Sequence, residues 1–232
     1  MPRTEVRGVM KGIGLITYNT NHLKTEQILS RIAGKYPLKV YALPFVARAP
    51  REVLVQHRPV QSVAAHPADL CSACDIPYIL VDRDTDIDSG CDLYIITGAG
   101  ILSSECVRGK RILNCHPGVI PAVRGLDAFK WAIIHQNPIG NTLHYIDEGV
   151  DQGEVIAILK TPVYRSDSLE SLARRHYERE IDMMCDFEKY LKTPQNDFPD
   201  IPEGKSTRRM PYEQEKQLSL AFEKYKQQFA EK

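Results

Sequence analysis

Short apolar runs separated by polar and amphipathic segments fill the chain as far as residue 163. Because the strand-like runs alternate with helical segments, we expect βαβ units in an α/β fold with a mostly parallel sheet. The runs that are typical of buried strands lie at residues 12–18, 39–45, 76–81, 92–97, 111–115, 141–146 and 154–163. Residues with helical spacing lie at 25–35, 62–74, 128–136 and 168–192, the last with Ser168 as its N-cap.

The pattern changes after Lys192. Residues 193–211 contain four prolines and few apolar residues, which predicts an extended arm. Residues 212–232 carry apolar side chains at steps of three and four residues, which predicts an amphipathic helix. We therefore divide the chain into a domain at 10–192 and an arm with a helix at 193–232. The apolar face of that helix is expected to pack on the domain or to form a homodimer interface.

Composition narrows the range of partners. Lys and Arg together number 30, as do Asp and Glu, so the formal net charge is zero and a polyanion is attracted only weakly. No apolar run approaches the ~20 residues of a membrane helix, and the first eleven residues lack an apolar signal region. We expect a cytoplasmic protein without a nucleic-acid or membrane partner, in which the six cysteines are reduced.

Candidate chemistry lies at the end of the strand predicted at 111–115. Asn114 and His116 are two residues apart in an extended segment, so their side chains project to the same side and Cys115 projects away. Pro117 disfavours helical geometry at His116 and keeps the segment extended. The carboxyl edge of a parallel sheet is where ligands bind, and an amide beside an imidazole is suited to polarising a carbonyl and moving a proton.

A second candidate is the acidic segment Asp147-Glu148-Gly149-Val150-Asp151-Gln152-Gly153 between two predicted strands. Loops at a sheet edge commonly carry function, although a solvated acidic turn has the same composition. A carboxylate close to His116 would orient the imidazole and raise its pKa. Spacing alone leaves open which of Asp147, Glu148 and Asp151 does so.

The segment Asn114-Cys115-His116-Pro117-Gly118-Val119-Ile120-Pro121-Ala122-Val123-Arg124-Gly125 resembles the signature of folate-dependent formyltransferases. Asp151-Gln152-Gly153 matches the D-x-G loop of that family, and the resemblance covers roughly residues 10 to 190. It implies a doubly wound sheet with a Rossmann-like first half. It also implies that 10-formyltetrahydrofolate is the formyl donor, with Asn114, His116 and Asp151 as catalytic residues. Ile120-Pro121 matches a position that is cis in relatives.

The resemblance also locates the folate. Its pteridine is expected against the backbone of two segments that flank the same sheet edge, Gly100-Ile101-Leu102 and Ile146-Asp147-Glu148. Relatives often carry an arginine or another large residue before the Ile-Leu pair. Gly100 departs from that pattern, which puts a side-chain contact at this point in doubt.

The resemblance implies that the formyl acceptor is an amine, and it favours an amino-sugar nucleotide. Trp131-Ala132-Ile133 and Arg208-Arg209-Met210-Pro211 resemble sugar-nucleotide N-formyltransferases. Methionyl-tRNA formyltransferases have a further C-terminal β-domain, whereas this tail is predicted to be helical, so a tRNA acceptor is disfavoured. Formyltetrahydrofolate hydrolases usually have an N-terminal regulatory domain, and none is expected here. The segment after the first strand lacks the glycine-rich phosphate loop of glycinamide ribonucleotide transformylases. Glu178 aligns loosely with a glutamate of those enzymes and keeps that acceptor open. Expected acceptor-binding residues are Asn19, Asn21, Arg124 and Glu178.

Two other classes of function are weighed against this one. A non-catalytic folate- or nucleotide-binding module could use the same fold, although it would not need the three catalytic residues. A metal enzyme is disfavoured because the histidines are scattered and lack H-x-x-x-H pairing.

Overall fold

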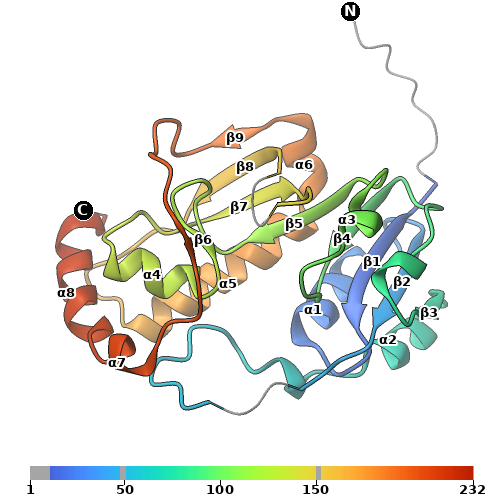
Figure 1. The fold of residues 1–232 in the computed structure, drawn as a ribbon, viewed down its shortest axis with the longest axis horizontal. Helices are drawn as coiled ribbons and strands as arrows, with labels where there is room; N and C mark the ends of the chain where they lie inside the picture. The colour runs from blue at the N-terminus through green and yellow to red at the C-terminus, as the bar shows by residue number, and fades with distance from the viewer. Residues whose placement is uncertain (1–10, 48–50, 150–152, 232) are drawn as a thin grey trace, which may run out of the picture.

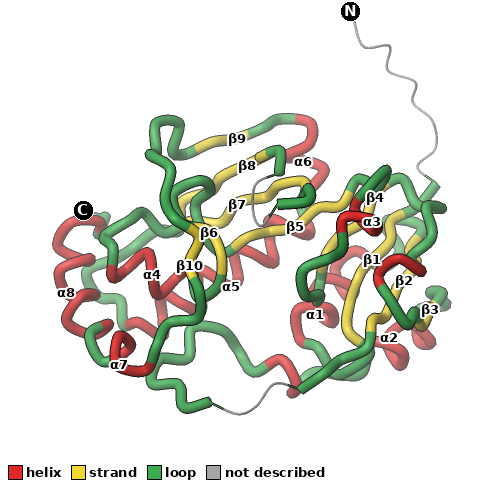
Figure 2. The backbone as a smooth tube through the Cα atoms, viewed as in Figure 1, coloured by secondary structure: helices red, strands yellow, loops and turns green. Residues whose placement is uncertain are grey.

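The computed structural model describes residues 11–47, 51–149 and 153–231. Within these residues the main sheet has eight strands in the order β3-β2-β1-β4-β5-β7-β8-β9 (Figures 1 and 2), and a small second sheet pairs β10 with β6. The strands are β1 (Ile13–Tyr18), β2 (Leu38–Leu43), β3 (Tyr78–Leu80), β4 (Leu93–Ile96), β5 (Ile112–His116), β6 (Arg124–Gly125), β7 (Gly140–Tyr145), β8 (Val155–Lys160), β9 (Gln195–Asn196) and β10 (Ser206–Thr207).

The first five strands of the sheet are mutually parallel, from β3 across to β5. β7 runs antiparallel between β5 and β8, and β9 pairs in parallel with β8. The predicted α/β fold with a mostly parallel sheet is therefore confirmed. Since β1, β4 and β5 point the same way, the segments that follow Tyr18, Ile96 and His116 meet at one edge of the sheet.

Helices cover both faces of the sheet, as a doubly wound fold requires. Side chains from alternate strand positions enter different clusters: Leu15 packs with α1 and α5, and Ile16 packs with α3. The helices are α1 (Leu23–Ile32), α2 (Pro67–Ala73), α3 (Ser104–Val107), α4 (Ala128–Ile134), α5 (Leu169–Cys185), α6 (Phe187–Lys192), α7 (Tyr212–Glu215) and α8 (Leu218–Phe229), with 3-10 turns at Gln61–Val63 and Asp84–Asp86.

Three predicted helices differ from the observed ones. The helix expected at 62–74 begins only at Pro67, because proline disfavours helical geometry at His66 and fits the first helical position. The long helix expected at 168–192 is divided into α5 and α6 at Asp186, whose φ is −99° and ψ is 20°. The tail helix is likewise divided into α7 and α8.

Two long connections run between distant elements of the fold. Residues 44–66, here called the strap, leave β2, pass close to α7 and return to α2 (Figure 1). Residues 193–211, the proline-rich arm, run from α6 through β9 and β10 to α7. α8 then packs its apolar face on α4, where Phe222 and Tyr225 join Phe129 in one buried cluster. The division at residue 192 stays a prediction.

Candidate active site

Asn114 and His116 lie at the carboxyl end of β5, as the strand pattern predicted. His116 is 4% exposed, Asn114 is half-buried, and Cys115 between them is packed in the core formed with α1 and α5. Burial raises the pKa of the Cys115 thiol far above its ordinary value. Cys115 is therefore a core side chain, and the polar groups that the strand offers to a ligand are those of Asn114 and His116.

His144 fixes the orientation of the Asn114 amide. The two residues are register partners on β5 and β7, and Asn114 Nδ2 lies 3.3 Å from His144 Nε2. His144 Nδ1 lies 3.1 Å from the Tyr145 carbonyl oxygen, which can only accept, so Nδ1 carries a proton. Nε2 of the neutral ring then accepts from Asn114, whose amide has a second N–H to offer a ligand. Spacing along the sequence does not predict this role of His144, because the role depends on the register between β5 and β7.

A carbonyl of the following loop holds the His116 imidazole. Nε2 of His116 lies 2.9 Å from the Val123 carbonyl oxygen, so this nitrogen donates. Gly118 leaves room for the ring, because a Cβ at this position would lie 2.7 Å from Nε2. The loop also contains the cis peptide bond Ile120–Pro121 that the resemblance implied.

Asp151 lies outside the described residues, so its place relative to His116 stays a prediction. Two other carboxylates of this loop are exposed: Asp147 accepts from the Gly149 amide at 2.9 Å, and Glu148 lies 3.7 Å from Arg108. Ile146 continues β7, and its amide donates to the Ile112 carbonyl at 2.9 Å.

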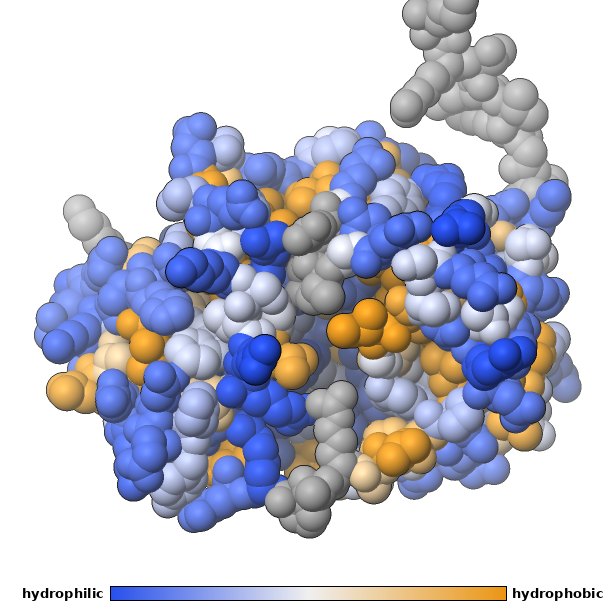
Figure 3. All heavy atoms as spheres, viewed as in Figure 1, coloured by the Kyte–Doolittle hydropathy of each residue, from blue (hydrophilic) through white to orange (hydrophobic). Residues whose placement is uncertain are grey.

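The other predicted folate segment follows β4. Gly100 is exposed, and a Cβ there would meet only the Tyr18 hydroxyl, at 3.8 Å. Ile101 is 85% exposed, and Leu102 and Ile146 both pack against the same apolar cluster. The two segments expected to contact the pteridine are thus brought together, with an apolar side chain left uncovered beside them. Figure 3 shows a hollow near the middle of this face with apolar side chains along one side.

The predicted acceptor residues are in separate places. Asn19 and Asn21 are exposed after β1, where Asn19 Oδ1 accepts from the Tyr78 hydroxyl at 2.8 Å and Asn21 Nδ2 donates to the Ala64 carbonyl at 2.8 Å. Arg124 Nη2 donates to Glu203 Oε1 at 2.9 Å and to the Gly204 carbonyl at 3.0 Å, both on the proline-rich arm. Its guanidinium is therefore engaged in holding the arm.

Glu178 is exposed on the outer side of α5. It lines a surface hollow of about 340 Å³ between α1 and α5, together with Arg31 and Asp182. Glu180, two residues further on, faces inward and is 1% exposed. The sequence analysis did not single out Glu180, because helical spacing alone did not show which glutamate of α5 is buried.

Glu180 joins two cations beside the end of β5. Lys24 Nζ at the start of α1 lies 2.7 Å from Oε1, and Arg58 of the strap pairs with Oε2. Burial opposes ionisation, but the charges of Arg58 and Lys24 prevail and lower the pKa of Glu180 to about 2. One turn earlier on α5, His176 Nε2 approaches the Pro117 carbonyl at 3.3 Å. This buried ionic cluster thus connects α1, the strap and α5 to the end of β5.

Burial and neighbouring cations keep nearby histidines neutral. Burial, followed by the charges of Lys24 and Arg58, lowers the pKa of His22 to about 4. Burial also lowers the pKa of His176 to about 4, despite the nearby carboxylate of Glu180. His22 Nδ1 lies 3.0 Å from the Thr25 hydroxyl, and the end of β4 makes room for its ring at Gly98. His22 before α1 and His176 on α5 are therefore neutral, and both lie within the electrostatic influence of the Glu180 cluster.

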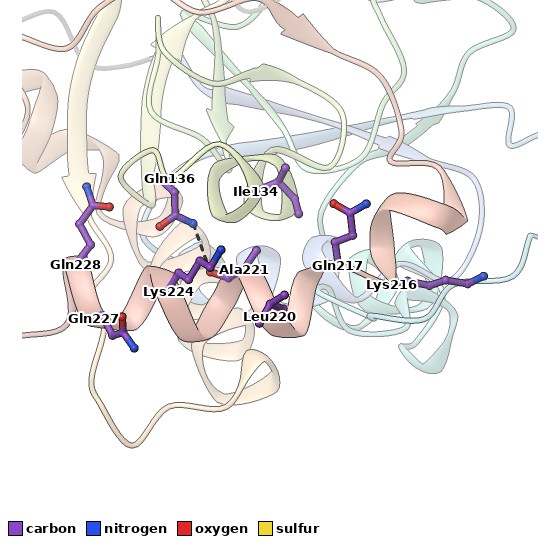
Figure 4. A pocket seen from close by; sticks show the side chains of 9 residues that line it. All are labelled: Ile134, Gln136, Lys216, Gln217, Leu220, Ala221, Lys224, Gln227 and Gln228. Carbon is purple, nitrogen blue, oxygen red and sulfur yellow. Dashed lines mark hydrogen bonds between the residues drawn. The ribbon is translucent and has the colours of Figure 1, made fainter.

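A surface hollow of about 830 Å³ is lined by none of these residues. It lies between the end of α4 and the exposed side of α8 (Figure 4). Within the residues described here, no three histidine, cysteine or carboxylate side chains are grouped to hold a metal ion. Across the same residues, no helix has both the length and the apolar character needed to cross a membrane.

Comparison with known proteins points to a single family. Residues 89–187 match the family model described as formyl transferase. Phosphoribosylglycinamide formyltransferase of Haemophilus influenzae is 37% identical over 71 residues, which are 30% of this chain and 34% of that protein. The matched segment thus spans about a third of the length of this relative.

Solved structures agree over a longer stretch. A 4-N formyltransferase from Francisella tularensis superposes with a TM-score of 0.61 at 16% identity, covering 86% of this chain and 77% of that one. A sugar N-formyltransferase from a Shewanella species superposes with a TM-score of 0.56 at 18% identity, covering 85% and 76%. These likenesses show the fold, and residues 89–187, from just before β4 to the end of α5, resemble the formyl transferase family.

Proposed function

We propose that this protein transfers a formyl group from 10-formyltetrahydrofolate to a primary amine of a small molecule. The observation that carries the proposal is the placement of Asn114 and His116 at the carboxyl end of β5, within the matched residues. Each side chain is oriented by a neighbour that is not itself a predicted catalytic residue: Asn114 by His144 and His116 by the Val123 carbonyl. Preorganised polar groups of this kind stabilise charge that develops in a transition state.

In the proposed reaction, the acceptor amine attacks the formyl carbon of the donor. A new C–N bond forms, and the carbonyl oxygen becomes an oxyanion that accepts from the Asn114 amide and from Nδ1 of His116 once that nitrogen has taken up the proton of the amine. The bond between the formyl carbon and N10 of the folate then breaks. The proton lost by the amine is carried to N10 by His116 or by a water that Asp151 organises. The products are an N-formyl amine and tetrahydrofolate.

The folate is proposed to lie against residues 100–102 and 146–148. Leu102 and Ile146 already share one apolar cluster, and the exposed side chain of Ile101 supplies an apolar surface beside it. A folate at this segment would lose apolar contact if Ile101 were shortened, so Ile101→Ala is expected to raise the donor KM severalfold. An unchanged donor KM in this variant would argue against a folate at this segment.

Two acceptor classes remain, and we propose an amino-sugar nucleotide as the first. The likeness to a sugar N-formyltransferase supports it. The likeness to phosphoribosylglycinamide formyltransferase supports glycinamide ribonucleotide equally. Asn19 and Asn21, exposed at the carboxyl edge after β1, are the proposed acceptor contacts. Arg124 and Glu178 are weaker candidates, because the first pairs with the arm and the second lies on the outer side of α5.

An acceptor screen tests the proposal. The purified protein is incubated with 10-formyltetrahydrofolate and each amine class, and release of tetrahydrofolate and formation of formyl product are followed together. Turnover with glycinamide ribonucleotide and none with amino sugars would overturn the first acceptor and leave the chemistry intact. Folded Asp151→Asn protein is expected to lose turnover, and near-normal transfer by it would remove Asp151 from the mechanism.

A further inference from the structure

The proline-rich arm is hydrogen-bonded to the loop that holds His116. β10 pairs in parallel with β6, so that Ser206 lies opposite Arg124 and Thr207 opposite Gly125. The Leu126 amide donates to the Thr207 carbonyl at 2.9 Å. The Thr207 hydroxyl reaches the Arg124 carbonyl at 2.8 Å and the Leu126 carbonyl at 3.0 Å. The arm therefore contacts the backbone from Arg124 to Leu126.

Two glycines make this contact close. The Gly204 amide donates to the Pro121 carbonyl at 3.0 Å, and a Cβ on Gly204 would lie 1.9 Å from the Ala122 carbonyl oxygen. Gly125 has a φ of 89°, and a Cβ there would lie 2.2 Å from the Thr207 carbonyl oxygen. Backbone meets backbone at both points, so a side chain at either glycine has to push the arm and the loop apart.

The arm is itself firmly held. The Met210 amide donates to Asp127 Oδ2 at 2.9 Å, and Arg51 of the strap donates to the Met210 carbonyl at 2.9 Å. Trp131 Nε1 on α4 donates to the Arg208 carbonyl at 2.7 Å, and the Met210 side chain is fully buried. The arm thus presents a fixed surface to the loop.

The loop passes this constraint to His116. Val123, whose carbonyl accepts from His116 Nε2 at 2.9 Å, stands between Ala122 and Arg124, and the arm contacts both of these neighbours. Because a carbonyl only accepts, Nε2 is the protonated donor in this bond. A displacement of the loop would weaken this bond and let the ring turn.

We propose that residues 201–210 are a positioning element that sets the orientation of the His116 ring, with Nε2 held as a donor, through the loop carrying Val123. The effect on turnover rests on the proposed function, whereas the effect on the imidazole does not. Gly204 and Thr207 are positioning residues, since they act on His116 through the loop.

The test compares Gly204→Ala and Thr207→Val with wild type. Gly204→Ala separates arm and loop, and Thr207→Val removes the hydroxyl at nearly constant volume in case the first variant folds poorly. Both are expected to lower kcat about tenfold or more with KM changed less than about twofold, because small misplacements of catalytic groups are costly. The pH dependence of kcat is expected to shift, and Thr207→Ser is expected to restore both.

The ring nitrogens of His116 are observed by 15N NMR in the same proteins. The expected result is a protonated Nε2 in wild type and a shifted or broadened Nε2 signal in both variants. Gly34→Ala is the matched control, because its φ of 77° makes alanine unfavourable while nothing lies within 4 Å of the added Cβ. Unchanged ring signals in Gly204→Ala and Thr207→Val would overturn the proposal, as would changes no larger than those of the control. If wild type transfers no formyl group, the NMR comparison still decides the positioning role.

Discussion

The carboxylate of Glu180 is shared by two cations in a region that water scarcely reaches. Two charge-assisted hydrogen bonds keep it ionised although burial opposes this, and they hold α1, the strap and α5 together. At the residue scale the buried ionic cluster is therefore a stability element next to the end of β5.

Glu180→Gln removes the charge and leaves Lys24 and Arg58 without a counter-ion. The free energy of unfolding is expected to fall by about 3 kcal/mol, since breaking a buried pair leaves an uncompensated charge. Chemical denaturation at neutral pH measures the change. The matched control is Glu178→Gln, an exposed glutamate of the same helix, which is expected to leave the stability almost unchanged. Equal stability of the two variants would contradict this account of the cluster.

The residues that sequence could identify are those whose relation is local. Asn114 and His116 share one strand, so their common side followed from alternation and Pro117. His144 and Glu180 were missed for a physical reason. The first acts through cross-strand register and the second through burial of one face of α5, and neither is encoded in spacing along the chain.

At the scale of elements, α7 is a junction between the strap and α4. Glu215 is fully buried at its end, lies 2.7 Å from Lys130 Nζ on α4 and accepts from the Leu54 amide at 2.7 Å. Burial opposes its ionisation, but the hydrogen bond and charge of Lys130 lower the pKa of this carboxyl. The tail is thereby joined to the domain by charge as well as by apolar packing.

Glu215→Gln is expected to destabilise this junction by about 3 kcal/mol, because Lys130 is left buried and unpaired. Amide hydrogen exchange is expected to show faster exchange in the strap and in α8 than in β1 or β4. Glu213→Gln on the same helix, where the glutamate is exposed, serves as the control. Uniformly accelerated exchange in all elements would show that α7 is not a separate junction.

At this scale, the sequence does not predict the very short strands or the point at which the long helix breaks. The mostly parallel sheet followed from alternation of strands and helices, but β6, β9 and β10 are too short to show any pattern. They form because tertiary contacts bring the arm against β8 and the His116 loop. Likewise, no proline or glycine lies at Asp186 to predict the break between α5 and α6.

At the scale of the whole molecule, three histidines with lowered pKa values make the free energy of unfolding depend on pH. Burial lowers the pKa of His57 to about 3, with Lys130 and Arg58 contributing, and His22 and His176 have pKa values of about 4. Between an unfolded-state value of ~6.5 and these values, only the unfolded chain takes up protons at these sites. Stability therefore rises with pH across this window and is lost as pH falls through it.

Urea denaturation from pH 7 to pH 2 tests this dependence. The free energy of unfolding is expected to fall steadily below about pH 6.5, with a further loss from Glu180 as pH falls from ~4.3 towards 2. His57→Gln is expected to reduce the slope between pH 6.5 and 4, because one fewer site takes up a proton on unfolding. A wild-type stability that is constant over this window would contradict the neutral state of these histidines.

The central claim is that Asn114 stabilises the oxyanion formed during formyl transfer. Its most direct test measures tetrahydrofolate release and N-formyl product in wild type and in Asn114→Ala with the best acceptor from the screen, after denaturation confirms that both proteins are folded. The account predicts transfer by wild type and a loss of about 10²–10³ in kcat for the variant. Near-normal turnover by folded Asn114→Ala, or no formyl product from wild type with any amine, would contradict it.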